Sequence, residues 1–182
     1  QSPEQLIFIA SVTTLIILFV LLSVNGKLKQ IKHLKPQSFG LAALLGFLNP
    51  FVYYIILFKS YSLLPAQVAQ PINMVWPIVL VLLSVPLLKQ KIGWKHLVAL
   101  FISFGGVFLI SSQGDVFSLQ KSNSTGIILG LSSAFVWTFY WIFNVKSKDD
   151  ELIKLFLSFA FGTVFLFIYL LLISKIKIEI NP

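Results

Sequence analysis

The chain has 182 residues, of which 57% are hydrophobic and only 11% are charged. Soluble domains are about 45–50% apolar and about 25% charged, so this composition excludes a water-soluble fold, which could not cover so much apolar surface. The net charge of +8 comes from 14 lysines without any arginine, and there is no cysteine, which excludes disulfides and thiolate metal sites. The lysines fall in short segments between apolar stretches, a pattern that favours orientation in a membrane over binding of nucleic acid.

Six stretches are apolar and long enough to cross a membrane as helices, which takes about 20 residues. They are residues 6–24, 39–58, 66–88, 97–112, 125–145 and 152–174. The fourth is the shortest, and Trp94 is an alternative first residue for it. Asn25 and Gly26 are predicted to stop the first helix. Residues 60–65 are predicted to form a turn, because the uncharged stretch 60–88 is too long for one straight span. The start of the chain does not resemble a signal peptide and has no initial Met, so we expect a part of a larger protein.

The lysines predict how the helices are oriented. The loops after the first, third and fifth stretches, with the start of the sixth, hold ten lysines, and the opposite side holds four. The ten are Lys27, Lys29, Lys32, Lys35, Lys89, Lys91, Lys95, Lys146, Lys148 and Lys154, and the four are Lys59, Lys121, Lys175 and Lys177. Because lysines are enriched on the cytoplasmic side, the loops 27–35, 89–95 and 146–148 are predicted to be cytoplasmic and the first residue extracytoplasmic.

The sequence therefore predicts an all-α fold, a polytopic membrane helical bundle with six transmembrane helices. It also carries an internal similarity, because residues 4–7 (Glu-Gln-Leu-Ile) and 150–153 (Asp-Glu-Leu-Ile) open stretches that lie five spans apart. A repeat of five helices inverts its own topology, which is a common transporter architecture. Chance similarity between helices rich in Leu, Ile and Phe is the alternative explanation.

Polar residues inside an apolar span indicate a cavity or a helix contact, because hydrocarbon offers them no partner. The third stretch has four such residues at three-residue spacing: Gln67, Gln70, Asn73 and Trp76. Pro71 and Pro77 are predicted to kink this helix and to free backbone carbonyls. We interpret this face as substrate-lining. Amide hydrogen bonding between structural helices is the alternative.

The second and fifth stretches add four candidate lining residues. Asn49 and Tyr53 share a helix face in the second, and Trp137 and Tyr140 lie near the middle of the fifth. Trp137 is compatible with a cavity or with packing. Trp141, nearer the predicted cytoplasmic end, is assigned to an interfacial aromatic belt.

Small residues in the fourth and sixth stretches predict close helix packing. The predicted packing positions are Ala99, Ser103, Gly105 and Gly106 in the fourth stretch and Ser158 and Gly162 in the sixth.

The sequence contains no cluster that indicates an enzyme, a metal site or a cofactor. The two histidines, His33 and His96, fall in loops beside lysines. The acidic run 149–151 is interpreted as a solvated loop with helix N-terminal charges. We expect no catalytic residues, and no carboxylate lies deep in any predicted span to serve a proton or sodium relay.

Several motifs are similar to those of one transporter family. They are residues 54–66 (ending Leu-Pro-Ala), 73–77 (Asn-Met-Val-Trp-Pro), 87–93 and 104–107 (Phe-Gly-Gly-Val), followed by Gly126, Gly130, Ala134, Trp137 and Tyr140. In this order and spacing they resemble the EamA family of the drug/metabolite transporter superfamily. A narrower similarity, in residues 73–77 and in the run around Trp137, is to the aromatic-amino-acid exporter branch.

The resemblance implies ten helices in two inverted five-helix repeats, of which this chain holds the second to seventh. Residues 1–112 would be the last four helices of the first repeat, 113–124 an extracytoplasmic linker, and 125–182 the first two helices of the second repeat. It further implies a plasma-membrane (bacterial inner-membrane) secondary transporter that exports or exchanges small, amino-acid-like metabolites by alternating access. Asn73, Trp76 and Tyr140 would line its path.

A structural or channel-like membrane subunit without carrier activity is the alternative function. The partners expected on either interpretation are membrane lipid and, for a carrier, a small-molecule substrate. Assembly with further copies of the chain is left open, and no nucleic acid is expected.

Overall fold

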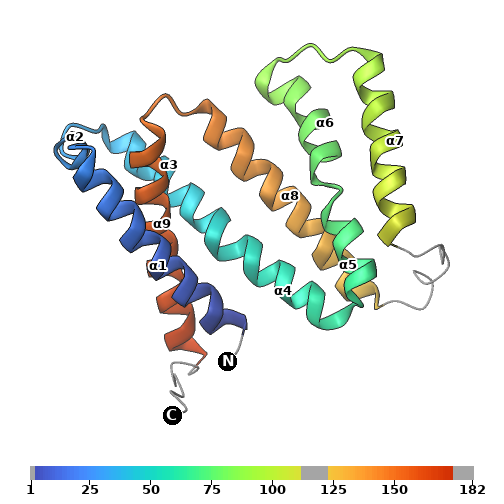
Figure 1. Ribbon diagram of the computed structural model, residues 1–182, viewed down its shortest axis with the longest axis horizontal. Coiled ribbons are helices and arrows are strands. Elements are labelled where there is room, and N and C mark those ends of the chain that lie inside the picture. Colours follow the sequence, from blue (N-terminus) through green and yellow to red (C-terminus); the bar gives the residue numbers. More distant parts are fainter. Residues whose placement is uncertain (1–2, 112–122, 174–182) are drawn as a thin grey trace. The chain divides into compact units, whose positions relative to one another are not determined.

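The computed structural model describes residues 3–111 and 123–173, and this part of the chain consists of helices and their connections, without a strand. The elements are α1 (Pro3–Val24), α2 (Leu28–Ile31), α3 (Pro36–Gly46), η1 (Phe47–Val52), α4 (Tyr53–Leu63), α5 (Ala66–Asn73), α6 (Trp76–Leu88), α7 (Trp94–Ser111), α8 (Ser124–Lys146) and α9 (Glu151–Leu172). Figure 1 shows them coloured along the chain. The predicted all-α class is confirmed.

Within the described residues, five helices are long and apolar enough to cross a membrane: Pro3–Val24, Pro36–Leu63, Ala66–Leu88, Ser124–Lys146 and Glu151–Leu172. They coincide with five of the six predicted stretches. The remaining stretch, 97–112, forms helix α7 and starts at Trp94. It is not among the five, and its predicted last residue lies outside the described part, so its role as a span stays a prediction.

The second span is longer than predicted. Helix α4 continues to Leu63, so the predicted turn at 60–65 is wrong over its first four residues. The reason is that the N–H of Leu64 still donates to the C=O of Ser60 at 3.0 Å, which continues the helical pattern. Pro65 is the first residue that stops it, because proline has no N–H to donate.

The end of α1 confirms the predicted stop at Asn25 and Gly26. Gly26 has a φ of 66°, a left-handed conformation that glycine adopts without a steric penalty. The N–H of Lys27 donates to the C=O of Leu22 at 3.0 Å, and that of Gly26 to Ser23 at 3.1 Å, which closes the helix in a Schellman motif. The turn brings Lys27 to the start of the next connection.

The chain divides into two compact units, Gln1–Tyr54 with Phe143–Pro182, and Ile55–Ile142. In the first, α9 packs against α1, α3 and η1. Its core cluster is formed by Leu22, Ala42, Ile153 and Leu157. In the second, the core cluster is formed by Leu64, Val68, Ala69 and Ile72.

In the first unit, α3 and α9 approach backbone to backbone. A Cβ added to Gly46 would lie 2.8 Å from the N of Gly162 and would also collide with the C=O of Ser158. A Cβ on Gly162 would collide with the ring of Pro50. Small residues at these positions are therefore what allows the two helices to pack so closely.

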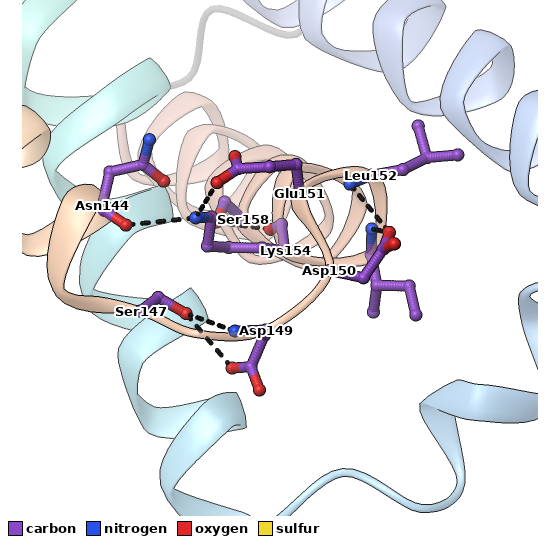
Figure 2. Close-up of polar contacts among 9 residues, drawn as sticks. Asn144, Ser147, Asp149, Asp150, Glu151, Leu152, Lys154 and Ser158 are labelled. Atoms are coloured by element: carbon purple, nitrogen blue, oxygen red, sulfur yellow. Dashed lines mark hydrogen bonds and ion pairs between the residues drawn. The ribbon is translucent and has the colours of Figure 1, made fainter.

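A polar network holds the start of α9 in the first unit (Figure 2). Asp150 caps the helix by accepting from the N–H groups of Leu152 and Ile153 at 3.1 and 3.3 Å. Its other carboxylate oxygen pairs with the Nζ of Lys27 at 2.6 Å. The cap satisfies otherwise unpaired donors of the first turn, and the ion pair ties the end of α1 to α9.

Lys154 counts among the cytoplasmic lysines of the orientation prediction and lies at the start of the predicted stretch 152–174, but its burial is not expected from the sequence. It lies one turn inside α9 with only 4% of its surface exposed. Its Nζ donates to the C=O of Asn144 at 3.1 Å and to Glu151 at 2.8 Å (Figure 2). The aliphatic stem can be buried because the ammonium reaches a carbonyl at the C-terminal end of α8, where a cation is favoured.

Gly46→Ala is expected to destabilise the protein by about 1–3 kcal/mol, because the new methyl group overpacks the α3–α9 contact. Gly40→Ala, in the same helix, meets nothing within 4 Å and serves as the matched control. Thermal unfolding in detergent measures both. If Gly46→Ala unfolds no earlier than Gly40→Ala, the close contact does not hold the unit together.

Asp150→Asn is expected to change stability in a pH-dependent way. The hydrogen bond from Lys27 lowers the pKa of Asp150 below its ordinary value. The contribution of this pair is therefore present above pH ~4 and is lost as the pH falls through the lowered pKa of the folded protein. At pH 7 the variant should be less stable by about 0.2–1 kcal/mol, and the difference should shrink in acid. Asn remains a good N-cap.

The matched control for this measurement is Asp149→Asn. Asp149 bonds to Ser147 and forms no ion pair within the described residues. Thermal unfolding of both variants between pH 3 and 7 compares them. Equal stability of Asp150→Asn and the parent protein at pH 7 would contradict a contribution from the pair.

Candidate functional site

The third span is interrupted in its middle, between the two prolines predicted to kink it. Helix α5 ends at Asn73 and α6 begins at Trp76. Pro71 is buried inside α5, and Pro77 lies in the first turn of α6, where a missing N–H leaves no bond within α6 unmade. The hydroxyl of Thr138 on α8 lies 2.9 Å from the C=O of Ala134 in its own helix and 3.2 Å from the C=O of Trp76, so its proton is shared between the two carbonyls. One backbone carbonyl at the start of α6 therefore contacts α8.

Asn73 is the buried polar side chain at this break. It is 3% exposed, and its Nδ2 donates to the Oγ of Ser133 on α8 at 3.0 Å. Ser133 in turn donates to the C=O of Gly130 at 2.6 Å. A Cβ on Gly130 would lie 2.8 Å from a methyl group of Ile72, so the glycine lets α5 approach α8 closely enough for this chain of hydrogen bonds.

Four aromatic rings gather beside Asn73 in the same unit. The ring of Trp137 lies 6.3 Å from Trp76, stacks on Tyr140 at 5.6 Å and meets Trp141 at 6.2 Å. Tyr140 is buried, Trp76 and Trp137 are half-buried, and Trp141 is 37% exposed. The structure thus brings together Asn73, Trp76, Trp137 and Tyr140, which were predicted separately as lining residues.

Asn73, the four rings and their hydrogen-bond partners carry no charge. Together they provide an amide, two hydroxyls, a backbone carbonyl and aromatic faces. The described residues of this unit include no Asp or Glu, and the described chain contains no group of three His, Cys, Asp or Glu that could hold a metal. A ligand here would be recognised through dipoles and ring stacking rather than through a countercharge.

Two predicted lining residues of the third span lie apart from this group. Gln67 and Gln70 are exposed. The Oε1 of Gln70 accepts from the hydroxyl of Tyr61 on α4 at 2.6 Å. Their side chains therefore face a different side of α5 from the buried Asn73.

Asn49 and Tyr53 belong to the other unit, at a second helix break. Asn49 is 7% exposed and has φ −147° and ψ 121°, an extended conformation inside η1. Proline disfavours helical geometry in the residue before it, and Pro50 has no N–H, so the carbonyl one turn earlier loses its helical donor. The buried Oδ1 of Asn49 has no hydrogen-bond partner in the described part of the chain.

The packing residues predicted on α9 lie in a close helix contact, whereas those predicted on α7 do not among the described residues. Ser158 and Gly162 lie on the α9 face that meets Gly46 and Pro50. On α7, Ala99, Ser103 and Gly106 are exposed and Gly105 is half-buried. A Cβ on either α7 glycine would meet nothing within 4 Å among the described residues. Close packing of the α7 face stays a prediction.

Sequence reasoning missed the hydroxyls of the site. Ser60 donates to the C=O of Gly126 at 2.8 Å, and Ser133 and Thr138 make the contacts to Asn73 and Trp76 given above. The signal was present: Ser133 lies seven residues after Gly126 and seven before Tyr140, on the face that the small and aromatic residues share.

Leucine substitutions at the two buried asparagines are expected to have different effects on stability. Asn73→Leu removes a hydrogen-bonded amide and should lower the free energy of unfolding by about 0.5–1.5 kcal/mol. Asn49→Leu removes an oxygen that has no partner and should be neutral or stabilising. Thermal unfolding of the two variants side by side makes the comparison. A larger loss for Asn49→Leu would show that its Oδ1 has a structural partner.

Comparison with known proteins identifies the family. A model of the EamA-like transporter family matches residues 1–112. An uncharacterized transporter from Archaeoglobus fulgidus is 31% identical over 83 residues, which are 44% of this chain and 28% of that protein. An uncharacterized transporter from Haemophilus influenzae is 22% identical over 141 residues, 77% of this chain and 45% of that protein.

The matched part of the chain thus spans less than half the length of these curated relatives. No solved structure matches the chain. The five apolar helices and the family match together identify an integral membrane protein of a family of transporters rather than enzymes. The chain belongs to the EamA-like transporter family.

Proposed function

We propose that the whole protein is a secondary transporter that exports or exchanges small, amino-acid-like metabolites by alternating access across the plasma (bacterial inner) membrane. The observation that carries this proposal is the break between α5 and α6, where buried Asn73 lies beside the rings of Trp76, Trp137 and Tyr140. Broken helices at mid-membrane are where secondary transporters bind their substrates.

The groups at the break suit a zwitterion that carries an apolar or aromatic side chain. Pro77 has no N–H to donate to the C=O of Asn73, so the end of α5 offers carbonyl oxygen to an ammonium group. The N–H groups of Ile78 and Val79 already donate to the C=O of Val75, so a carboxylate is favoured here by the positive end of the α6 dipole alone. The stacked rings offer flat surfaces to a third, apolar group.

We further propose that the chain holds six of ten helices, with residues 1–112 in the first repeat, 113–124 as an extracytoplasmic linker and 125–182 in the second repeat. The end of the family match at residue 112 supports this division. The excess of lysines in loops 27–35, 89–95 and 146–148 supports a cytoplasmic position for these loops and an extracytoplasmic first residue.

Trp76→Ala in the full-length protein is expected to reduce exchange of labelled L-phenylalanine about tenfold or more, the effect of losing ~1.4 kcal/mol of substrate contact. Asn73→Ala and Tyr140→Ala should act in the same direction. Trp94→Ala is the matched control, because Trp94 belongs to the same unit and is 76% exposed. Counterflow in proteoliposomes, with a panel of labelled amino acids, measures the rates.

Three results would argue against the proposal in different ways. Normal exchange by both Trp76→Ala and Asn73→Ala would remove the lining assignment while leaving a transporter. Flux that does not saturate and shows no counterflow would favour a channel-like subunit. Absence of flux for every labelled amino acid, with correct insertion, would favour a structural subunit.

A further inference from the structure

The connection between α1 and α3, residues 25–35, is here called the basic connector. It joins the candidate spans Pro3–Val24 and Pro36–Leu63 and contains the short helix α2. Because both neighbouring helices leave the apolar part of the membrane at this point, the short connector lies at the level of the lipid headgroups.

The basic connector is held on the first unit by three apolar side chains. Leu28, Ile31 and Leu34 recur at three-residue spacing, are half-buried, and pack against the core cluster of this unit. Its first lysine, Lys27, is paired with Asp150 at 2.6 Å. The backbone of the connector is therefore placed before any ligand binds.

The remaining lysines of the basic connector point away from this core. Lys29, Lys32 and Lys35 are exposed, as is His33, and none of the three lysines forms an ion pair within the described residues. Of the three neighbouring acidic residues, Asp150 pairs with Lys27, while Asp149 and Glu151 have the partners that Figure 2 shows. The positive charge of Lys29, Lys32 and Lys35 is thus not neutralised inside the unit.

We propose that the basic connector is a binding site for anionic phospholipid headgroups. Lysine ammonium groups at a membrane surface attract phosphate-bearing headgroups, and three of them on an anchored backbone offer several donors to one phosphate without first having to be ordered. Lys89, Lys91 and Lys95 carry the same number of charges. Lys89 and Lys91, however, lie within residues 89–93, which are not helical and contain only one half-buried apolar side chain, Ile92, and Lys95 lies in the first turn of α7. The connector therefore binds more strongly than this second lysine cluster.

The test compares two variants that lose the same charge. Full-length protein in detergent is titrated with phosphatidylglycerol or with phosphatidylcholine, and bound lipids are counted by native mass spectrometry. The parent protein should prefer phosphatidylglycerol. In K29Q/K32Q/K35Q, the ratio of affinities for phosphatidylglycerol and phosphatidylcholine should fall about fivefold for each lysine removed. K89Q/K91Q/K95Q should retain most of the preference.

A parent protein without preference for phosphatidylglycerol would overturn the proposal, and so would equal losses in the two triple variants, which indicate net charge rather than a site. Far-UV circular dichroism checks that both variants fold. A second measurement needs no variant: photoactivatable phosphatidylglycerol should cross-link to peptides that contain residues 25–35, and labelling confined to other peptides contradicts the site. Neither readout requires transport, so the result is independent of the proposed function.

Discussion

Inside the hydrocarbon of a membrane, each backbone N–H and C=O needs a partner supplied by the protein itself. Helices meet this demand residue by residue, which is why the described chain consists of helices. The two places where proline interrupts the pattern are therefore the costly places, because Pro77 cannot donate to the C=O of Asn73 and Pro50 cannot donate to that of Gly46. Close contacts surround both places: Thr138 lies 3.2 Å from the C=O of Trp76, and Pro50 packs directly on Gly162.

Glycine allows the close approach of neighbouring segments. At Gly46, Gly126, Gly130 and Gly162 a Cβ would lie within 3 Å of an atom of a neighbouring segment. With only hydrogen at these positions, hydroxyls of one helix reach the backbone of the next, as Ser60 reaches Gly126 at 2.8 Å. Apolar side chains gain little when they exchange lipid contacts for protein contacts. Close packing and hydrogen bonds of this kind therefore drive helix association in a membrane.

Charge in the described chain is concentrated at the ends of helices and in loops, and the interior relies on dipoles. In the first unit, the pair of Lys27 with Asp150 and the contact of Lys154 with the end of α8 join neighbouring elements at one end of the bundle. The surroundings of Asn73 hold amide, hydroxyl and ring instead. This separation agrees with the proposed function, in which the ends face lipid headgroups and the middle receives a neutral or zwitterionic molecule.

Hydropathy and proline spacing by themselves determined the all-α class, five of the spans and the interval in which the third span breaks, because these depend on local composition and on backbone chemistry that proline carries with it. Only the tertiary structure decided that Asn73 is buried against Ser133 while Gln70 is exposed, and that Lys154 is buried against the end of α8. These outcomes depend on which face of one helix meets which face of another. Periodicity shows that a face exists, but the partner opposite it is supplied by residues far along the chain.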